Sequence, residues 1–336
     1  IAGRIRAAIE DESIVIDGNS MDISASVGIA MSNGGALRDP ETLLKRADTA
    51  MYRAKEGGRA RTEIFDEVVR DRTRRRAEMS AQLQTAIDDD ALELHYQPMV
   101  DLVSGKVAAV EAFVRWPHPD QGLLTPTEFL DIATEAGLDQ QLDMLVVHQA
   151  CLEAKRWHNQ MGDASPPVHV NVVGESLLAG TLSQRLDQCL RATGLPPEKL
   201  VIELSERFLM NNGQANTDRL EQVRALGVRL CIDDVGTGAT VLPRLSRYRL
   251  HVLKVDGSLL RGLVDDETTQ QLVGGVLALG RALGLTVAVE AVEEQAAIPI
   301  LRSLGAQLAQ GHVFSPPLPA AKLEPLLTLR STIARS

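Results

Sequence analysis

The sequence predicts an α/β protein in which a TIM-like (β/α)8 barrel follows a smaller α+β unit and a linker helix. Two observations predict the barrel. About eight strand-like apolar runs alternate with helical segments over roughly 250 residues, which is the count and size of this architecture. Each run also has a polar side chain at or near its C-terminal end. A doubly wound open sheet is the structural alternative, and the polar side chains distinguish the two.

Composition limits the classes of function. The 336 residues are 44% hydrophobic, enough for a sizeable core, and the net charge is −10. This charge argues against a general binder of DNA, RNA or anionic membranes, although a small anionic ligand held by a metal is compatible with it. Three scattered cysteines have no metal-ligand spacing and suit buried thiols in a reducing cytoplasm.

No targeting or spanning segment is visible in the sequence. No apolar run approaches the roughly 20 residues that cross a bilayer, and no signal peptide is seen. We therefore expect a cytoplasmic location and no membrane contact from this segment. Ile1 falls inside a helical pattern, so we expect a fragment, and a sensor or membrane anchor upstream is compatible with it.

The pattern of residues 1–64 predicts a helix, then strands, then a second helix. Helical apolar spacing covers residues 1–9, and strand-like alternation covers residues 22–30. An amphipathic helix follows over residues 40–55 and is closed by Gly57 and Gly58.

Residues 65–78 are predicted to form a linker helix. The stretch has little Gly or Pro, and five arginines gather between Arg70 and Arg76. A polybasic patch for nucleic acid or lipid is the alternative, but acidic residues flank the cluster on both sides, which favours a solvated helix.

The strand candidates of the barrel follow in chain order. Two helices, 127–136 and 140–159, separate the second and third strands, and another ends near residue 193. The strand candidates are 92–100, 107–116, 168–172, 200–204, 228–232, 251–255, 286–289 and 307–314.

The polar residues at these strand ends would converge at one mouth of a barrel, whereas an open sheet would spread them along a line. Burying five carboxylates beside one amide requires neutralising charge. No His or Cys belongs to the set, so hard cations such as Mg²⁺ or Mn²⁺ are predicted rather than Zn²⁺. The residues are Glu111, Asn171, Glu203, Asp233, Asp234, Lys254, Glu290 and Gln310.

Two cations a few ångström apart suit in-line attack of water on a phosphodiester. Lys254 offers a point charge to hold the attacking water. Arg115 lies four residues after Glu111 and offers a planar fork for a phosphate group. Spacing and chemistry thus predict a metal-dependent hydrolase with a phosphate substrate.

Residues 79–333 resemble the EAL domain, the cyclic di-GMP phosphodiesterase family, along its whole length. Many ordered matches carry the resemblance, including Asn171. The others are 96–102 (Tyr-Gln-Pro-Met-Val-Asp-Leu), 111–119 (Glu-Ala-Phe-Val-Arg-Trp-Pro-His-Pro), 203–206 (Glu-Leu-Ser-Glu), 233–238 (Asp-Asp-Val-Gly-Thr-Gly), 253–256 (Leu-Lys-Val-Asp), 290–293 (Glu-Ala-Val-Glu) and 310–319 (Gln-Gly-His-Val-Phe-Ser-Pro-Pro-Leu-Pro).

Residues 1–64 resemble the C-terminal half of a GGDEF (diguanylate cyclase) domain. The match rests on residues 26–30 (Ser-Val-Gly-Ile-Ala), 47–48 (Ala-Asp), 50–55 (Ala-Met-Tyr-Arg-Ala-Lys) and 58–59 (Gly-Arg). The signature loop of that family is missing, because Gly34-Gly35 is followed by Ala-Leu-Arg. We expect no cyclase site in this segment.

The EAL resemblance implies a barrel whose first strand is antiparallel to its neighbour, and hydrolysis of cyclic di-GMP to linear pGpG with two Mg²⁺ or Mn²⁺ ions. By analogy, one ion is bound by Glu111, Asn171, Glu203 and Asp233, and the second by Asp233, Asp234 and Glu290.

The remaining roles are also given by analogy. Lys254 would contact the nucleophilic water, and Glu206 would brace the loop after Asp234. Substrate contacts are expected from Gln97, Arg115, Asp256 and Gln310. A homodimer is expected through barrel helices near residues 233–238, and the linker helix is a second candidate for the dimer contact.

Several residues depart from the family pattern without removing a ligand. Phe113 replaces the leucine of the family name, Val235 replaces a phenylalanine, and Ala291 replaces a glycine. An active phosphodiesterase is the favoured hypothesis because every expected ligand is present. A receptor that binds cyclic di-GMP without cutting it, and a scaffold that only transmits a signal, are the alternatives.

Overall fold

The computed structural model describes residues 1–10, 13–16, 19–31, 40–65, 67–173, 176–177, 180–206, 208, 213–236, 245 and 248–328. The chain divides into two compact units, Ile1–Met79 and Ser80–Ser336. In the described part, no helix combines the length and the apolar character needed to span a bilayer.

Up to residue 65, the described part of the first unit contains two small strand pairs and two helices. Its elements are α1 (Ala2–Glu10), β1 (Ser13–Ile16), β2 (Asn19–Asp22), β3 (Val27–Ala30), α2 (Pro40–Glu56) and β4 (Thr62–Phe65). β1 and β2 pair antiparallel, whereas β3 and β4 pair parallel. The single strand expected over residues 22–30 is wrong, because its two ends pair with different strands and residues 23–26 separate them.

Helix α3 covers Glu67–Asp88. It confirms a helix in the predicted linker but extends ten residues beyond the expected end at residue 78. Near its C-terminal end, Gln82 Oε1 lies 3.0 Å from His118 Nε2 and Gln84 Nε2 donates to Gln141 Oε1. Both contacts lie within the second unit, to which the last turns of α3 belong.

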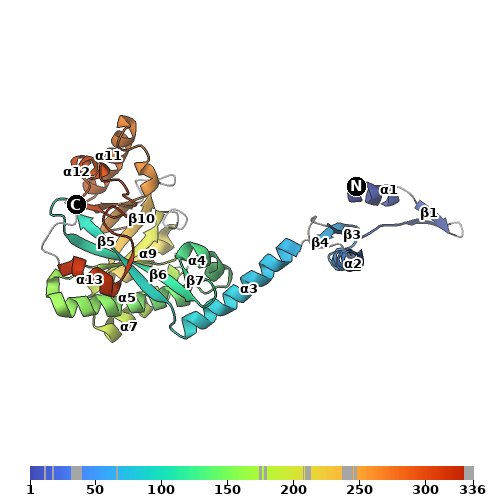
Figure 1. The fold of residues 1–336 in the computed structure, drawn as a ribbon, viewed down its shortest axis with the longest axis horizontal. Helices are drawn as coiled ribbons and strands as arrows, with labels where there is room; N and C mark the ends of the chain where they lie inside the picture. Colours follow the sequence, from blue (N-terminus) through green and yellow to red (C-terminus); the bar gives the residue numbers. More distant parts are fainter. Residues whose placement is uncertain are drawn as a thin grey trace. The chain divides into compact units, whose positions relative to one another are not determined.

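The second unit is a closed barrel of eight strands (Figure 1). β5 is antiparallel to both of its neighbours in the ring, β6 and β13, and all other neighbouring pairs in the ring are parallel. The barrel and its antiparallel first strand are therefore confirmed. In chain order the ring consists of β5 (Glu93–Asp101), β6 (Val107–His118), β8 (Val168–Asn171), β9 (Leu200–Ser205), β10 (Arg229–Val235), β11 (Val252–Val255), β12 (Thr286–Val289) and β13 (Leu308–Ala309).

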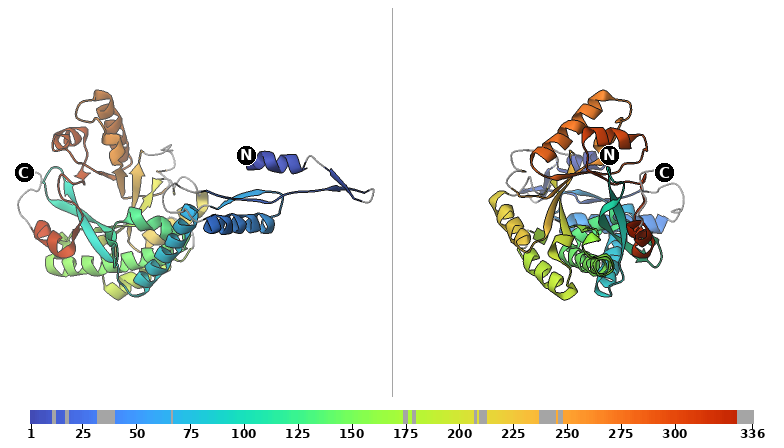
Figure 2. Two further views of the ribbon diagram at one scale, coloured as in Figure 1. Left: turned by 45° about the vertical axis from the view of Figure 1, so that its right-hand side comes forward. Right: turned by 90° about the vertical axis from the view of Figure 1, so that its left-hand side faces the viewer.

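Helices surround these strands (Figure 2). Two further short strands, β7 (Gly122–Leu124) and β14 (Leu318–Pro319), extend the sheet. The helices are α4 (Pro126–Glu135), α5 (Asp139–Met161), α7 (Leu182–Thr193), α9 (Gly213–Ala225), α11 (Glu267–Ala282), α12 (Ala297–Leu304) and α13 (Ala320–Thr328).

The last barrel strand is much shorter than the predicted 307–314, because the chain turns at Gly311. A Cβ atom at Gly311 would lie 2.1 Å from the carbonyl oxygen of Val292. Around this close approach, Val292 N donates to Gln310 O and Val313 N donates to Val292 O. Residues after Ala309 therefore pair with the chain that follows β12 instead of continuing the strand.

The interior of the barrel contains a small apolar cluster. Val201, Cys231 and Val252, from three adjacent strands, form one buried cluster. Cys151, Cys189 and Cys231 are all buried free thiols, as the sequence predicted.

Helix α11 offers a matched test of its packing on the barrel. A Cβ atom at Gly280 would lie 2.8 Å from Val287 Cγ2, whereas a Cβ at Gly275 would meet nothing within 4 Å. We expect Gly280→Ala to lower the free energy of unfolding by about 1–2 kcal/mol through overpacking. Gly275→Ala should raise it by about 0.5–1 kcal/mol, because Ala loses less chain entropy in a helix.

Urea unfolding followed by tryptophan fluorescence measures both effects, since Trp116 and Trp157 are buried in the barrel unit. Equal shifts of the two variants in one direction would contradict this account of the contact between α11 and β12.

Candidate active site

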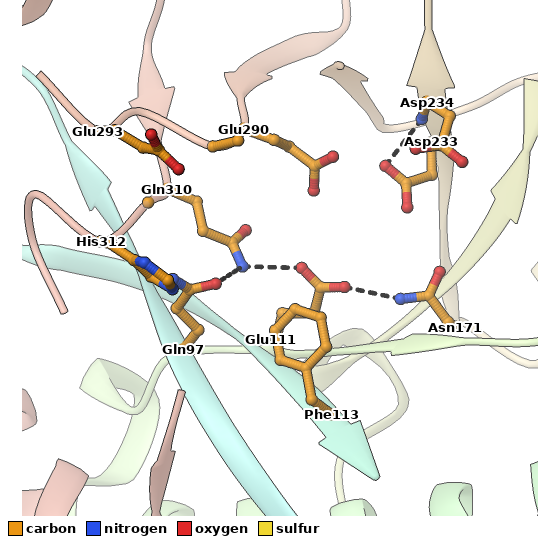
Figure 3. Close-up of a pocket in the computed structure, with 12 residues that line it drawn as sticks. Gln97, Glu111, Phe113, Asn171, Asp233, Asp234, Glu290, Glu293, Gln310 and His312 are labelled. Atoms are coloured by element: carbon orange, nitrogen blue, oxygen red, sulfur yellow. Dashed lines mark hydrogen bonds between the residues drawn. The ribbon is translucent and has the colours of Figure 1, made fainter. Parts of the chain in front are cut away.

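Two consecutive carboxylates face the mouth of the barrel at the end of β10. Successive side chains of a regular strand point to opposite faces, so Asp233 and Asp234 would normally diverge. The pairing of β10 with β11 shifts register between Ile232 and Val235, and Asp234 has a φ of 59°. Asp234 N also donates to Asp233 Oδ1 at 2.9 Å. This local irregularity turns both carboxylates toward the cavity (Figure 3).

The mouth holds a cavity of about 400 Å³. Most of the predicted polar residues line it, which an open sheet would not allow. The lining residues are Gln97, Glu111, Phe113, Asn171, Asp233, Asp234, Glu290, Ala291, Glu293, Gln310, Gly311 and His312.

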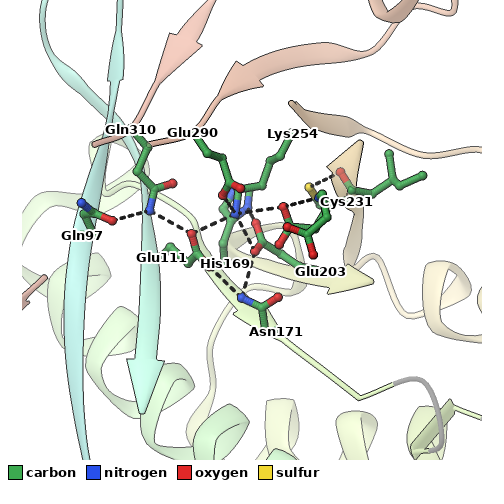
Figure 4. Close-up of polar contacts among 12 residues, drawn as sticks. Gln97, Glu111, His169, Asn171, Glu203, Cys231, Lys254, Glu290 and Gln310 are labelled. Atoms are coloured by element: carbon green, nitrogen blue, oxygen red, sulfur yellow. Dashed lines mark hydrogen bonds and ion pairs between the residues drawn. The ribbon is translucent and has the colours of Figure 1, made fainter. Parts of the chain in front are cut away.

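The ammonium group of Lys254 lies among four carboxylates beneath this cavity (Figure 4). Its Nζ is 2.9 Å from Glu111 Oε2 and 2.9 Å from Glu203 Oε2. Asp233 Oδ1 is 3.5 Å away, and Glu290 also forms an ion pair with it. Lys254 is fully buried, so its charge is compensated by these carboxylates instead of by water.

Burial and mutual repulsion shift the pKa values of this cluster. Burial raises the pKa of Glu111 to about 7, and the neighbouring Glu203 adds to the increase while Lys254 opposes it. Burial likewise raises the pKa of Glu290 well above its ordinary value. Burial alone would lower the pKa of Lys254, but the carboxylates, led by Glu111, hold it well above its usual value. The site thus concentrates acidic groups beyond the number that one ammonium neutralises.

The carboxylates form two groups with the spacing of cation ligands. In one group, oxygens of Glu111, Asp233 and Glu290 lie within 4.8 Å of one another, and in the other, oxygens of Asp234, Asp256 and Glu290 do so. Both groups contain only oxygen ligands and share Glu290, which fits two neighbouring Mg²⁺ or Mn²⁺ ions. Asp256, predicted to contact substrate, is thus placed with the carboxylates; it also accepts a hydrogen bond from Ser258 N.

Amide side chains connect the carboxylates across strands. Asn171 Nδ2 donates to Glu111 Oε1 at 2.7 Å and lies 3.2 Å from Glu203 Oε2. Gln310 Nε2 donates to Gln97 Oε1 at 2.9 Å and to Glu111 Oε2 at 2.8 Å (Figure 3). Within the described residues, Gln310 Oε1 is buried without a hydrogen-bond partner, so this side chain retains one acceptor.

Five predicted residues lie outside the cavity lining: Glu203, Lys254 and Asp256, described above, and Arg115 and Glu206. Arg115 donates from Nη1 to Val114 O, and its guanidinium carbon is 5.8 Å from the ring centroid of Phe113. Glu206 is buried and accepts a hydrogen bond from Gly236 N at 3.1 Å. Glu206 therefore holds the chain directly after β10, as the loop-bracing role requires.

One placement at a strand end is wrong. Glu111 lies well inside β6, which continues to His118 and forms a hairpin with β7. It still reaches the mouth because β6 pairs with β8 over Val110–Ala112 and extends beyond the barrel after that.

Two of the departures from the family pattern lie close to the ends of barrel strands. Ala291, directly after Glu290, has a φ of 48°, a left-handed conformation that a glycine adopts more easily than an alanine. Val235 is buried at the end of β10. Thr237 and Gly238, and with them part of the expected dimer contact near residues 233–238, lie outside the described residues, as do Gly34 and Gly35.

The sequence reasoning missed two histidines. His312 lines the cavity. His169 is buried below it, and its Nδ1 lies 2.6 Å from Glu203 Oε1. Burial, helped by the charge of Lys254, lowers the pKa of His169 to about 3. The sequence did contain an indication of this position. His169 lies two residues before Asn171, so both side chains lie on one face of the strand.

Comparison with known families agrees with this geometry. Residues 80–317 match the EAL domain family, and residues 1–61 match the family described as diguanylate cyclase, GGDEF domain. The chain therefore belongs to the EAL domain family, and part of a GGDEF domain precedes the barrel.

Two relatives from Pseudomonas aeruginosa are similar over most of the chain. The cyclic di-GMP phosphodiesterase NbdA is 37% identical over 94% of this chain and 40% of its own length. The bifunctional diguanylate cyclase/cyclic di-GMP phosphodiesterase MucR is 34% identical over 92% of this chain and 45% of its own length. The chain thus spans less than half the length of these relatives.

Solved structures show the same fold. The PaMucR phosphodiesterase in complex with c-di-GMP is 34% identical, with a TM-score of 0.70, covering 73% of this chain and 99% of that one. The EAL domain of Mycobacterium smegmatis DcpA is 29% identical, with a TM-score of 0.61, covering 70% of this chain and 97% of that one.

Replacing Lys254 with the apolar, similarly long Met tests the electrostatic account of the site. In EDTA we expect Lys254→Met to lower the free energy of unfolding by about 3 kcal/mol, since buried carboxylates lose their counter-charge. Added Mn²⁺ should recover more stability in this variant than in the wild type, because the cation replaces the missing charge.

The control is Lys322→Met, at an exposed position, for which a change within about 0.5 kcal/mol is expected. Equal urea midpoints for Lys254→Met and the wild type in EDTA would contradict the counter-ion role of Lys254.

Proposed function

We propose that this chain hydrolyses cyclic di-GMP to linear pGpG, with two Mg²⁺ or Mn²⁺ ions bound at the mouth of the barrel. The observation that carries the proposal is the pair of carboxylate groups sharing Glu290 beside a cavity of about 400 Å³. The similarity to phosphodiesterases named for cyclic di-GMP supports the choice of substrate.

Each part of the site has a role in this reaction. By the family resemblance, Glu111, Asn171, Glu203 and Asp233 would hold one ion, and Asp233, Asp234 and Glu290 the other. In this structure Glu290 lies within reach of both carboxylate groups, and Asp256 lies beside the second. When bound, such ions lower the pKa of water and neutralise charge on the phosphate. Water attacks phosphorus, the bond from phosphorus to the 3′ oxygen breaks, and a proton passes to that oxygen, which leaves pGpG.

The remaining side chains bind and orient. Lys254 is proposed to orient the attacking water as a point charge beneath the cavity, where its ammonium pairs with four carboxylates. Gln310 lines the cavity and is proposed to contact the substrate there. Arg115, adjacent to the cavity through Phe113, is proposed to bind a substrate phosphate, and Gln97 fixes the orientation of Gln310.

We also propose that the protein acts in the cytoplasm and forms a homodimer, with no nucleic acid partner. The many acidic groups at the mouth and the net charge of −10 support the exclusion of nucleic acid. Light scattering over a concentration series would measure the oligomeric state.

Substituting Glu111 tests the proposed reaction. We expect Glu111→Gln to reduce kcat for conversion of cyclic di-GMP to pGpG by at least about 100-fold, because a direct ligand is lost and even outer partners of metal ligands typically cost 10–100-fold. Chromatography of the reaction with Mg²⁺ or Mn²⁺ measures the product.

The same substitution at the exposed Glu198 serves as the control, and its rate should equal that of the wild type. If the chain binds cyclic di-GMP tightly but does not convert it with either metal, the receptor hypothesis replaces the enzyme hypothesis. If the chain binds neither cyclic di-GMP nor metal, the hypothesis of a scaffold that only transmits a signal is favoured.

A further inference from the structure

The buried polar pair His169 and Glu203 lies beneath the proposed cation site. His169 is 1% exposed and Glu203 is 0% exposed. His169 Nδ1 and Glu203 Oε1 are 2.6 Å apart, which is a short hydrogen bond (Figure 4). His169 does not line the cavity, so it has no route to touch a substrate there.

Sheet register explains how the two side chains meet. Asn171 of β8 is opposite Glu203 of β9, and His169 is opposite Val201. His169 and Asn171 are two residues apart, so they share the inward face of β8 in successive layers. His169 is therefore the diagonal neighbour of Glu203, a distance that a ring and a long carboxylate side chain span together.

The hydrogen bond leaves the two oxygens of Glu203 in different environments. Oε1 accepts from His169, whereas Oε2 lies 2.9 Å from Lys254 Nζ and 3.2 Å from Asn171 Nδ2. Glu111 differs, because its Oε1 accepts from Asn171 and its Oε2 accepts from Lys254 and Gln310. Of these two carboxylates, Glu203 alone is also held by a histidine of the next layer down, His169.

We propose that His169 is a positioning residue that fixes Glu203 by donating its Nδ1–H to Oε1, so that Glu203 presents the single oxygen Oε2 to a divalent cation. This inference rests on the proposed function for the identity of the cation. A Glu203 that binds a cation is ionised and can only accept a hydrogen bond, so the proton belongs to Nδ1. A carboxylate held in one rotamer loses less entropy on binding a cation, which raises the affinity.

A separate cation bound by His169 does not account for this geometry. Ligand atoms of His169, Glu203 and Cys231 lie within 4.8 Å of one another, and nitrogen and sulfur ligands suit Zn²⁺. Metal–ligand bonds of about 2.0–2.2 Å would place the nitrogen and oxygen at least about 3 Å apart in a tetrahedral site. The observed 2.6 Å is shorter, and Cys231 Sγ donates to Ile232 O instead.

Amide substitutions at His169 distinguish the two ring nitrogens. The side-chain nitrogen of Asn falls near the Nδ1 position and that of Gln near the Nε2 position, while Leu removes the donor at similar volume. Binding of Mn²⁺ to the whole chain is measured by electron paramagnetic resonance of the free ion. We expect His169→Gln and His169→Leu to raise the Kd by about 10–100-fold, and His169→Asn to stay near the wild-type value.

Equal Mn²⁺ affinity in the Asn and Gln variants and the wild type would overturn the positioning role. If His169→Leu does not fold, the Asn and Gln variants still give the comparison. In assays of phosphodiesterase activity, His169→Gln should raise the Mn²⁺ concentration needed for half-maximal rate. His169→Asn should keep that concentration near the wild-type value.

A measurement without metal separates this inference from the proposed function. Nitrogen-15 NMR of histidine-labelled wild-type protein in EDTA should show His169 as the Nδ1–H tautomer, assigned by the loss of its signal in His169→Asn. An Nε2–H tautomer would overturn the inference even if the enzyme is active. If the wild type binds no Mn²⁺, the proposed cation site fails, and so does the role of His169 in cation binding.

Discussion

Repulsion among carboxylates is the constraint on which the rest of this barrel depends. Glu111, Glu203 and Asp233 lie in three barrel strands, Glu290 directly follows a fourth, and all four contact the ammonium of Lys254. Gathering them needs a closed ring of strands, since only closure brings these positions to one mouth. Like charges in a buried site also need an internal cation, which Lys254 supplies. The closed ring therefore brings the carboxylates together, and the ammonium of Lys254 compensates the repulsion that this creates.

Much of the fold could be predicted from the sequence, because buried parallel strands are continuous apolar runs and their polar ends stand out. The strand limits were harder to predict. The final strand ends at Ala309 because Gly311 lies against the backbone of Val292, and no local pattern encodes that long-range approach. Glu111 lies inside β6 for a related reason, since the strand continues into a hairpin beyond the barrel. Strand ends depend on pairing partners, which sequence periodicity does not reveal.

The sequence indicated which residues belong to the site, but not which of them contact one another. The grouping of Asp256 with Asp234 and Glu290 depends on how two loops meet. His169 stands between valines in an apolar run, where a lone histidine is as consistent with simple core packing as with function. Only the register of β8 against β9 shows that it reaches Glu203. The roles assigned to individual residues in cation and substrate binding remain predictions.

The irregular end of β10 makes both carboxylate groups depend on one local backbone conformation. Asp233 belongs to one carboxylate group and Asp234 to the other, yet a single register shift and one left-handed residue orient both. A change that restored regular strand geometry would turn one of them to the opposite face while leaving every acidic residue in the sequence. The acidic residues in the sequence therefore do not define the site by themselves, because their orientation also depends on the backbone conformation at the end of β10.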